Sequence, residues 1–473
     1  MKRIRAFFSN PIFSKVGPIL VLALLLGFTW VLRSGVLEPP KKKIMLIGVD
    51  CLDWDILNPL LERGQCPNLS RLIENGTSGI LMSEGETISP VIWTSIATGQ
   101  PREVHGVVNF FRMDGNKPVL AGPEMERIPV TSADRKVPAL WNILTMEEKD
   151  VACLGWWATW PAEEINGSMV SGFSTYSDKA YVSRGVHAGE NVAHLTYPET
   201  LNENIQDLMI DVDTVTHEDL DRFLDVDNWN SPIFLKEEMN RGVEYTLPWS
   251  YATDTSYINI SEYLLDRNEY DLVMTYIQGT DTCSHRFWEF REDQHALSSI
   301  LHDYDLYPEL EGDYRKYFSK ALDNYYIYTD ALIGRLLKYV DKNTVVILCS
   351  DHGFGTFTEE TRGPNTMFSG THRLEGVVIM SGRGIRKGAK LNDDTPPTIF
   401  DITPTILALL ELPLAEDMPG MPIFDAFDAN LRSDYTPIYV KSYNVNFRAG
   451  EMPKTVPMDA EYEERLRSLG YIQ

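Results

Sequence analysis

The sequence has few basic residues relative to its acidic ones. Its 473 residues include 43 Lys and Arg against 68 Asp and Glu, which gives a formal net charge of −25. Binding to a nucleic acid backbone depends on clustered Lys and Arg side chains that neutralise phosphates. This balance argues against a nucleic acid polymer as partner. If the substrate is a phosphate ester, its charge must be met locally, by metal ions or by a few cations.

Cysteine is also scarce and irregularly placed. The five cysteines are odd in number, and no two of them form a Cys-x-x-Cys pair. A disulfide framework or a thiolate zinc site would need paired or regularly spaced cysteines, so the sequence indicates neither. Internal repeats and low-complexity tracts are absent as well. With 43% hydrophobic and 23% charged residues, the composition is that of an ordinary globular protein.

Only one stretch is long, apolar and free of charge. Residues 16–32 follow a basic segment at 1–15 and would span about 26 Å as a helix, close to the thickness of a bilayer core. Since no small-residue cleavage site follows, we expect an uncleaved transmembrane anchor, with a cleaved signal peptide as the alternative. Residues 33–43 then form a linker. This predicts a single-pass cell-membrane protein with its N-terminus in the cytoplasm and its catalytic domain outside.

The remainder, residues 44–473, alternates between two kinds of pattern. Apolar runs at 44–49, 150–155, 271–277, 344–349 and 376–380 predict buried strands. Helical patterns lie between most of them, including one from about 52 to 76 and a long one at about 314–340. This alternation predicts an α/β domain with a mostly parallel central sheet and helices on both faces. Residues 175–265 break the pattern, and we expect an inserted cap there with a helix at 217–226.

Several of these strands are followed by side chains that bind metals. Because ligands of open α/β sheets bind beyond the carboxyl ends of the strands, these side chains are expected to meet at one edge of the sheet. Carboxylate and imidazole together suit zinc or a similar divalent ion with positions open for substrate. The residues concerned are Asp50, Asp281, His285, Asp351, His352 and His372.

A candidate nucleophile precedes an apolar helical pattern at residues 87–99. Ser89 stands directly before Pro90, which is favoured at the first position of a helix. A hydroxyl there suits a phosphate group, because the helix N–H groups point at it. An ordinary N-cap is the alternative role for such a serine. Thr87, two residues earlier, is the second candidate.

The order of these motifs is more specific than any one of them. Asp50, SPVIWTSIATG at 89–99, His105-Gly106, DTCSH at 281–285, SDHGF at 350–354 and GTHR at 370–373 follow one another along the chain. In this order they resemble the type I phosphodiesterase/nucleotide pyrophosphatase family of the alkaline phosphatase superfamily, from about residue 43 to residue 412. The sulfatase frame Cys/Ser-x-Pro-x-Arg is not matched, because Trp93 stands where its arginine would be.

The resemblance implies an alkaline phosphatase-like fold with two divalent metal ions, for which Zn²⁺ is expected. It implies one ion held by Asp281, His285 and His372, and a second held by Asp50, Asp351 and His352 with the Ser89 oxygen beside it. By the same resemblance Asn109 would contact a phosphate oxygen, and His105 would hold its own loop. Independently of the family, Arg286 and Arg373 follow two of the histidines, and we consider them for binding substrate charge.

Three functions are compatible with this reading. The first is hydrolysis of a phosphodiester or pyrophosphate through a covalent phosphoserine, acting on a small molecule or a lipid headgroup. The second is transfer of the phosphoryl group to a lipid or glycan headgroup. The third is a non-catalytic surface-binding protein, which the complete ligand set disfavours. Specificity would lie in residues 175–265 and near Trp156, Trp157 and Trp160, which are otherwise packing residues.

Overall fold

The computed structural model describes residues 41–85, 87–115, 117–118, 120–121, 126–127, 129–172, 194–235, 246–291, 311–356, 370–445 and 447. They belong almost wholly to one compact unit, Lys43–Gln473. Within these ranges, no helix combines the length and the apolar character needed to cross a membrane. The expected anchor at residues 16–32 lies outside the described residues.

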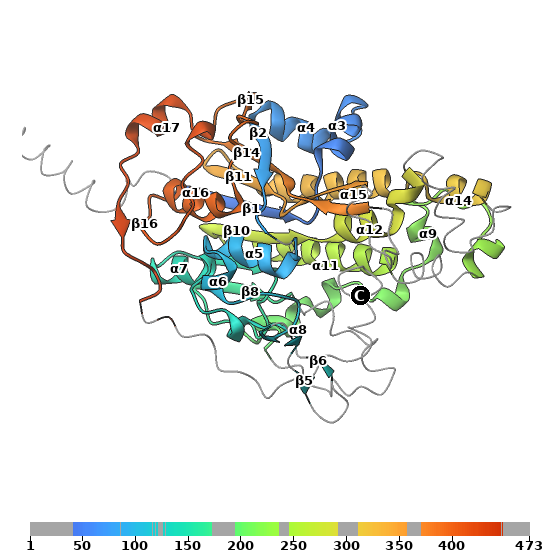
Figure 1. Ribbon diagram of the computed structural model, residues 1–473, viewed down its shortest axis with the longest axis horizontal. Coiled ribbons are helices and arrows are strands. Elements are labelled where there is room, and N and C mark those ends of the chain that lie inside the picture. The colour runs from blue at the N-terminus through green and yellow to red at the C-terminus, as the bar shows by residue number, and fades with distance from the viewer. Residues whose placement is uncertain are drawn as a thin grey trace, which may run out of the picture. The chain divides into compact units, whose positions relative to one another are not determined.

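The unit is built on a nine-stranded sheet (Figure 1). Five of its eight strand pairings are parallel and three are antiparallel. The sheet is therefore mixed, with parallel pairings in the majority. In spatial order its strands are β15 (Ala389–Lys390), β2 (Gly76–Met82), β14 (Glu375–Gly382), β11 (Thr344–Cys349), β1 (Lys43–Val49), β10 (Leu272–Ile277), β7 (Val151–Leu154), β8 (Gly167–Val170) and β9 (Thr196–Tyr197).

Strand β14 accounts for most of the antiparallel pairing. Strands β12 (Gly353–Thr356) and β13 (Gly370–Arg373) form an antiparallel pair between β11 and β14, where a parallel arrangement would need a long crossover connection. Strand β14 then runs antiparallel to both β11 and β2. Strand β2 was not predicted, because its Gly76-Thr77-Ser78-Gly79 start is a poor strand sequence. Gly76 is needed there, since a Cβ would lie 2.0 Å from the Met380 carbonyl oxygen.

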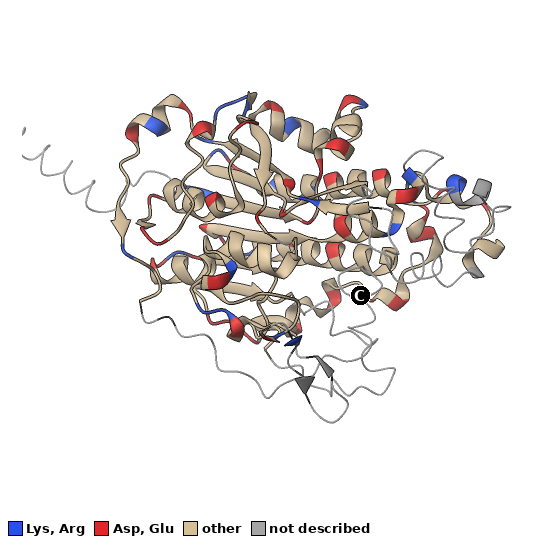
Figure 2. Cartoon of the chain, in the orientation of Figure 1, with Lys and Arg blue, Asp and Glu red and all other residues tan. Residues whose placement is uncertain are grey.

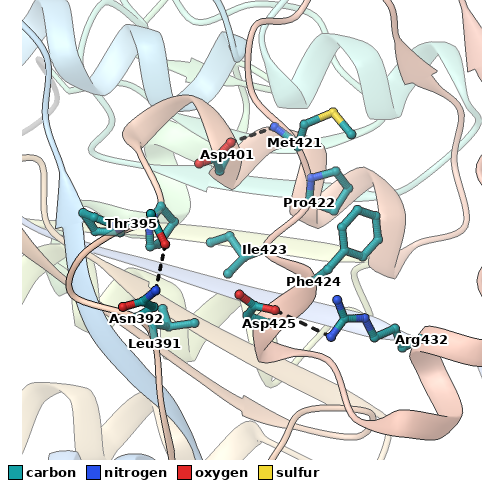
Figure 3. A pocket seen from close by; sticks show the side chains of 12 residues that line it. Leu391, Asn392, Thr395, Asp401, Met421, Pro422, Ile423, Phe424, Asp425 and Arg432 are labelled. Atoms are coloured by element: carbon teal, nitrogen blue, oxygen red, sulfur yellow. Dashed lines mark hydrogen bonds and ion pairs between the residues drawn. The ribbon is translucent and has the colours of Figure 1, made fainter.

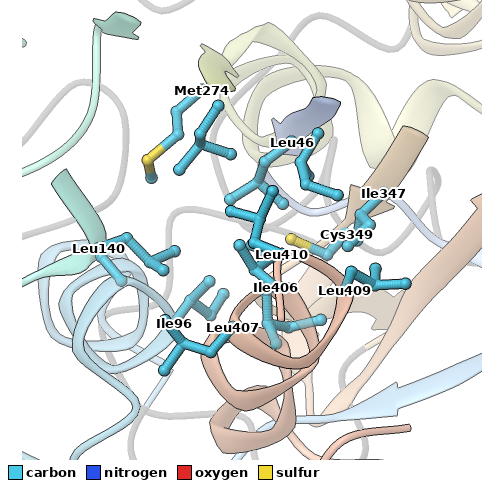
Figure 4. Close-up of a cluster of buried hydrophobic side chains, with 14 of the residues drawn as sticks. Leu46, Ile96, Leu140, Met274, Ile347, Cys349, Ile406, Leu407, Leu409 and Leu410 are labelled. Carbon is cyan, nitrogen blue, oxygen red and sulfur yellow. The ribbon is translucent and has the colours of Figure 1, made fainter. Parts of the chain in front are cut away.

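Helices cover both faces of the sheet, as expected. Along β1, Met45 and Ile47 join one hydrophobic cluster, whereas Ile44 and Leu46 join the other, because successive side chains of a strand point to opposite faces. Figure 4 shows part of the second cluster, where Leu46 and Ile347 of the sheet pack near α16 (Ile402–Leu409) and α5 (Ser89–Thr98). The central strands carry almost no charge (Figure 2).

Two predicted helices are each divided in two. The pattern at 52–76 contains α3 (Trp54–Glu62) and α4 (Pro67–Glu74), separated at Gly64, whose φ is 70°. The pattern at 314–340 contains α14 (Glu311–Phe318), α15 (Ala321–Leu336) and a 3-10 turn at Leu337–Tyr339. Apolar periodicity continues across both breaks, so it could not locate them. The helix expected at 217–226 is the shorter α9 (His217–Leu220).

The end of the expected cap insertion belongs to the core. Helix α11 (Leu247–Leu265) packs against β10, α12 (Gly279–Arg291) and α15, and most of its residues are buried. A helix that is buried nearly all round lacks the polar face of a surface cap. The idea of a cap is thus confined to residues before α11, and of these 173–193 and 236–245 lie outside the described residues. For the remaining part it stays a prediction.

Candidate metal centre

The candidate ligands come from the carboxyl ends of three adjacent parallel strands. Asp50 directly follows β1, which lies between β10 and β11 in the sheet. Helix α12 begins two residues after β10 and carries Asp281 and His285 one turn apart on one face. Asp351 and His352 follow β11. This is the edge where ligands of such sheets are expected to bind.

The sixth ligand arrives from a different element. His372 lies on β13, in register with Phe354 of β12. With it, the six residues form two triads whose donor atoms lie within 4.8 Å of one another. We call Asp50, Asp351 and His352 the closed triad, and Asp281, His285 and His372 the open triad. The structure thus brings together both groups that the family resemblance implied.

The closed triad is fully buried, and its donor atoms converge. His352 Nε2 lies 3.4 Å from Asp50 Oδ1 and 3.3 Å from Asp351 Oδ2. His352 Nδ1 lies 3.2 Å from the Gly353 carbonyl oxygen, and this contact places the proton on Nδ1 and the lone pair on Nε2. Asp351 Oδ1 accepts the Cys51 N–H at 3.1 Å, which leaves Oδ2 facing the histidine.

The open triad also consists of carboxylate and imidazole groups, and its two histidines are slightly exposed. His372 Nε2 lies 3.2 Å from Asp281 Oδ1 and 2.7 Å from His285 Nε2. The Nδ1–H of His372 donates to the Thr87 carbonyl oxygen at 3.0 Å, so its lone pair too lies on Nε2. The side chain of His372 is 12% exposed and that of His285 is 8% exposed.

The donor set fits divalent metal ions. Asp50 Oδ1, Asp351 Oδ2 and His352 Nε2 are buried and make no hydrogen bond within the described residues. Buried carboxylates are costly unless they are paired or bind a cation. Nitrogen and oxygen donors in groups of three match the ligand preference of zinc, among other divalent ions. Both triads could therefore hold a metal ion.

The pKa shifts follow from the same crowding. Burial, together with the charge of Asp281, raises the pKa of Asp50 to about 7. Burial also raises the pKa of Asp351, with Asp50 adding to the effect. In the open triad, burial raises the pKa of Asp281, but His285 and His372 more than offset this and hold it below its usual range. The closed triad therefore has the greater unmet need for positive charge.

Ser89 and Thr87 have different surroundings. Ser89 is the first residue of α5 and is fully buried, and its Oγ makes no hydrogen bond within the described residues. The Thr87 hydroxyl instead lies 3.1 Å from His372 Nδ1. Trp93, one turn after Ser89, donates from its indole to Asp50 Oδ2 at 3.3 Å. This contact anchors the start of α5 beside the closed triad.

Other expected site residues have structural partners. Arg373 forms ion pairs with Asp53 at 2.5 Å and Asp55 at 2.8 Å, so its charge is already matched. The Asn109 amide oxygen accepts the N–H of Phe110 in its own loop. Arg286 is buried on α12 next to His285. A role for any of the three in binding substrate stays a prediction.

His105 holds its loop, as the resemblance implied. Its Nδ1 accepts the Val107 N–H at 3.1 Å, and its Nε2–H donates to Ser95 Oγ at 3.0 Å. Burial, together with Arg135 and Arg102, lowers the pKa of His105 to about 3. The imidazole is therefore neutral and fixes the turn after α6 (Arg102–His105).

Sequence reasoning missed the residues that support Asp50. The Tyr276 hydroxyl donates to Asp50 Oδ2, and Trp93 donates to the same oxygen. Cys51, directly after Asp50, has a φ of 58°, a strained value for a residue with a side chain. Nothing in the local pattern of an apolar strand marks Tyr276, but its position next to Gly48 of β1 follows from the pairing of β1 with β10.

A separate cavity lies in the C-terminal part of the chain (Figure 3). Its lining includes Asn392, Asp401, Ile423 and Asp425 and none of the triad residues. Asp425 pairs with Arg432 at 3.6 Å, and Asp401 accepts the Met421 N–H at 2.7 Å. Its charged groups thus have partners within the protein, and no metal-binding triad lines it.

The mixed sheet, its helical layers and the triads at the strand ends define an α/β protein with a candidate two-metal centre. The model of the type I phosphodiesterase/nucleotide pyrophosphatase family matches residues 44–391. The chain therefore belongs to that family, as its motif order suggested.

Individual relatives are remote. A 2,3-bisphosphoglycerate-independent phosphoglycerate mutase of Rippkaea orientalis is 26% identical over 115 residues, which are 24% of this chain and 21% of that protein. The match thus spans about a fifth of the relative's length. Wild-type alkaline phosphatase PafA has a TM-score of 0.49 at 13% identity, covering 83% of this chain and all of that one. Human ENPP5 has a TM-score of 0.44 at 12% identity, covering 82% and 100%.

Proposed function

We propose that the protein is a two-metal phosphodiesterase or pyrophosphatase that acts through a covalent phosphoserine at Ser89. The observation that carries this proposal is the pairing of two Asp/His triads with a buried serine hydroxyl at the start of α5. Zinc is the proposed ion for both triads, since their donors are imidazole nitrogens and carboxylate oxygens. The substrate is a small phosphate ester or a lipid headgroup.

Ser89 is proposed as the nucleophile in preference to Thr87. The Thr87 carbonyl and hydroxyl oxygens both lie near His372 Nδ1, so this residue orients a ligand. The Ser89 hydroxyl is buried at a helix N-terminus, where N–H groups favour phosphate oxygens. Bound divalent ions would supply a lowered hydroxyl pKa, polarised phosphoryl oxygens and stabilisation of the leaving oxygen.

The covalent step does not require a histidine base. The Ser89 oxygen attacks phosphorus in line, its proton passes to water, and the bond to the leaving oxygen breaks. Water then attacks the phosphoserine and restores the Ser89 hydroxyl while phosphate ester or phosphate leaves. Both His352 and His372 use their Nδ1 protons to bond backbone carbonyls, which suits ligands rather than bases.

A transferase is the second candidate, because a phosphoserine can react with an alcohol as well as with water. Lipid and glycan headgroups would supply that alcohol. We also propose that residues 16–32 anchor the protein in the cell membrane with the catalytic domain outside. A non-catalytic surface protein is disfavoured, since both triads are complete.

The test is an assay on three chromogenic esters before and after chelation. We expect bis-p-nitrophenyl phosphate to be cleaved faster than p-nitrophenyl phosphate, and p-nitrophenyl sulfate not at all. Chelator should abolish turnover, and zinc should restore it. Product that shifts to an alkyl ester when alcohol is added would favour the transferase. Full activity after verified removal of metal would contradict the proposal.

A further inference from the structure

The two oxygens of Asp50 have opposite surroundings. Asp50 Oδ2 accepts hydrogen bonds from the Tyr276 hydroxyl and from the Trp93 indole N–H. Asp50 Oδ1 makes no hydrogen bond within the described residues and lies 3.4 Å from His352 Nε2. A carboxylate held in this way presents one oxygen to a metal and keeps the other for its supporting donors.

A second donor directs the Tyr276 proton. The Trp157 indole N–H donates to the Tyr276 oxygen at 2.8 Å. Because a lone pair of the phenol oxygen receives this bond, the phenol proton points at Asp50 Oδ2. The three residues form a chain of hydrogen bonds in which Asp50 and Tyr276 are buried and Trp157 is partly buried, and each bond strengthens the next. Trp157 also packs edge-on against Phe110, with ring centroids 5.5 Å apart.

The rings around this chain are held tightly. Trp93 meets Trp156 and Tyr276 edge to face, with ring centroids 5.0 and 5.2 Å apart. The Trp156 indole donates to the Trp93 carbonyl oxygen at 3.0 Å. Gly48 makes room for them, since a Cβ there would lie 2.7 Å from the Trp93 ring. Asp50 Oδ2 is therefore fixed by donors that have little freedom to move.

We infer that Tyr276, aimed by Trp157, is a positioning residue that makes Asp50 a one-oxygen ligand of the closed-triad metal. This inference rests on the proposed function, because it requires a metal at that triad. Trp93 adds a weaker donor to the same oxygen and joins Asp50 to the helix that begins at Ser89. The chain of hydrogen bonds would thus align ligand, metal and nucleophile together.

The inference is tested by zinc binding to Y276F. The metal-stripped protein is titrated with zinc against a chromophoric chelator, and two binding steps are resolved. Loss of a hydrogen bond to a metal ligand typically weakens metal binding about 10–100-fold. We expect Y276F to weaken one step by this amount and leave the other unchanged. W157F, which keeps the phenol but removes its donor, should weaken the same step by a smaller factor.

Y326F is the matched control. The Tyr326 hydroxyl is equally buried and lies next to the same loop, but among the described residues its hydrogen bonds go to the backbone of Cys51 and Asp53 alone. Its removal should change neither zinc step. Two unchanged steps in Y276F, or equal weakening in Y276F and Y326F, would overturn the inference while leaving the proposed function intact. A wild-type protein that binds no zinc would overturn both. If Y276F does not fold, W157F alone decides by the same criterion.

Discussion

The closed and open triads use the same kinds of residue in different surroundings. Every member of the closed triad is wholly buried, and burial raises the pKa of both of its carboxyl groups, with Asp50 adding to the rise at Asp351. In the open triad the single carboxylate lies between two histidines, which are slightly exposed. The protein thus encloses one prospective metal site among hydrogen-bond donors and leaves the other slightly exposed at its two histidines.

The difference suggests a division of labour between the triads. The closed triad is anchored to α5 through Trp93, so it is suited to act on Ser89. The open triad is better suited to the entering water or the leaving group, because its two histidines are slightly exposed whereas the closed triad is fully buried. In the open triad, the Thr87 carbonyl oxygen accepts the His372 Nδ1 proton, and helix α12 carries Asp281 and His285.

The largest expected effect is loss of the nucleophile. S89A should lower kcat by about 10³-fold or more. Removal of the covalent nucleophile from other enzymes lowers kcat by at least this factor. Both zinc ions should remain bound, because the triads do not include Ser89. The measurement is steady-state hydrolysis of bis-p-nitrophenyl phosphate together with zinc content.

The matched variant is S89T, which keeps a hydroxyl at the same position and should retain much of the activity. Near-wild-type turnover in S89A, combined with inactivity in T87A, would transfer the nucleophile role to Thr87.

Isosteric neutralisation should separate the triads directly. D351N and D281N should each weaken one zinc-binding step by more than about 100-fold, because each removes a charged metal ligand. Loss of a residue that only hydrogen-bonds a ligand weakens metal binding by about 10–100-fold. In the absence of metal, the two substitutions should change Tm in opposite directions. Burial raises the pKa of Asp351, so its charge opposes folding and D351N should raise Tm. Asp281 is held below its usual pKa by His285 and His372, so D281N should lower Tm.

Thermal unfolding in the presence of chelator checks this pair of variants. The same sign of change in both would mean that the triads do not differ electrostatically in the way described above.

A smaller effect is expected from the support of the open triad. T87V removes the hydroxyl near His372 Nδ1 but keeps the Thr87 backbone carbonyl that accepts its proton. Zinc binding at one step should weaken about 10-fold, at the low end of the range for such supports. Competition with a chelator measures this effect. If T87V were inactive while both zinc-binding steps stayed unchanged, Thr87 would do more than orient His372.

The smallest effect concerns Asp254, a buried carboxylate on α11 that holds the start of α12. It accepts the N–H groups of Gln278 and Gly279, each at 3.0 Å, and the Tyr325 hydroxyl at 2.8 Å. An amide cannot accept from all three donors, so D254N should lower the free energy of unfolding by about 1–3 kcal/mol. Urea unfolding measures this change.

The same variant has a predicted pH signature. Burial raises the pKa of Asp254 to about 7, above its value of about 4 in an unfolded chain. Between these values the folded state binds more protons, so the stability that Asp254 contributes falls as pH rises towards 7. The advantage of wild type over D254N should therefore be larger at pH 5 than at pH 8. An advantage that grows with pH would contradict the raised pKa.

Much of the site was predictable because its residues occupy readable positions. Asp50, Asp351 and His352 follow continuous apolar runs, and such runs end at one edge of a parallel sheet. Asp281 and His285 are spaced by one helical turn. The zinc assignment itself stays a prediction, as do Ser89 as nucleophile and the membrane anchor.

The supports of these ligands were not predictable in the same way. Tyr276 lies within an apolar strand, and its role depends on lying beside Gly48 across the sheet. Arg373 follows a ligand histidine in sequence, but the fold turns it towards Asp53 and Asp55. Local patterns carry no information on contacts between residues some 200–300 positions apart, such as Tyr276 and Asp50.

The sequence by itself determined the family, the α/β alternation and the six candidate ligands, because strand hydrophobicity and motif order are written in neighbouring residues. Only the tertiary structure decided how these ligands divide into a closed and an open triad, that β14 makes the sheet mixed, and that α11 belongs to the core. The physical reason is that burial, hydrogen-bond partners and charge crowding arise only when distant segments pack together. Asp50 becomes a one-sided ligand candidate through the packing of β1 against β10 and α5.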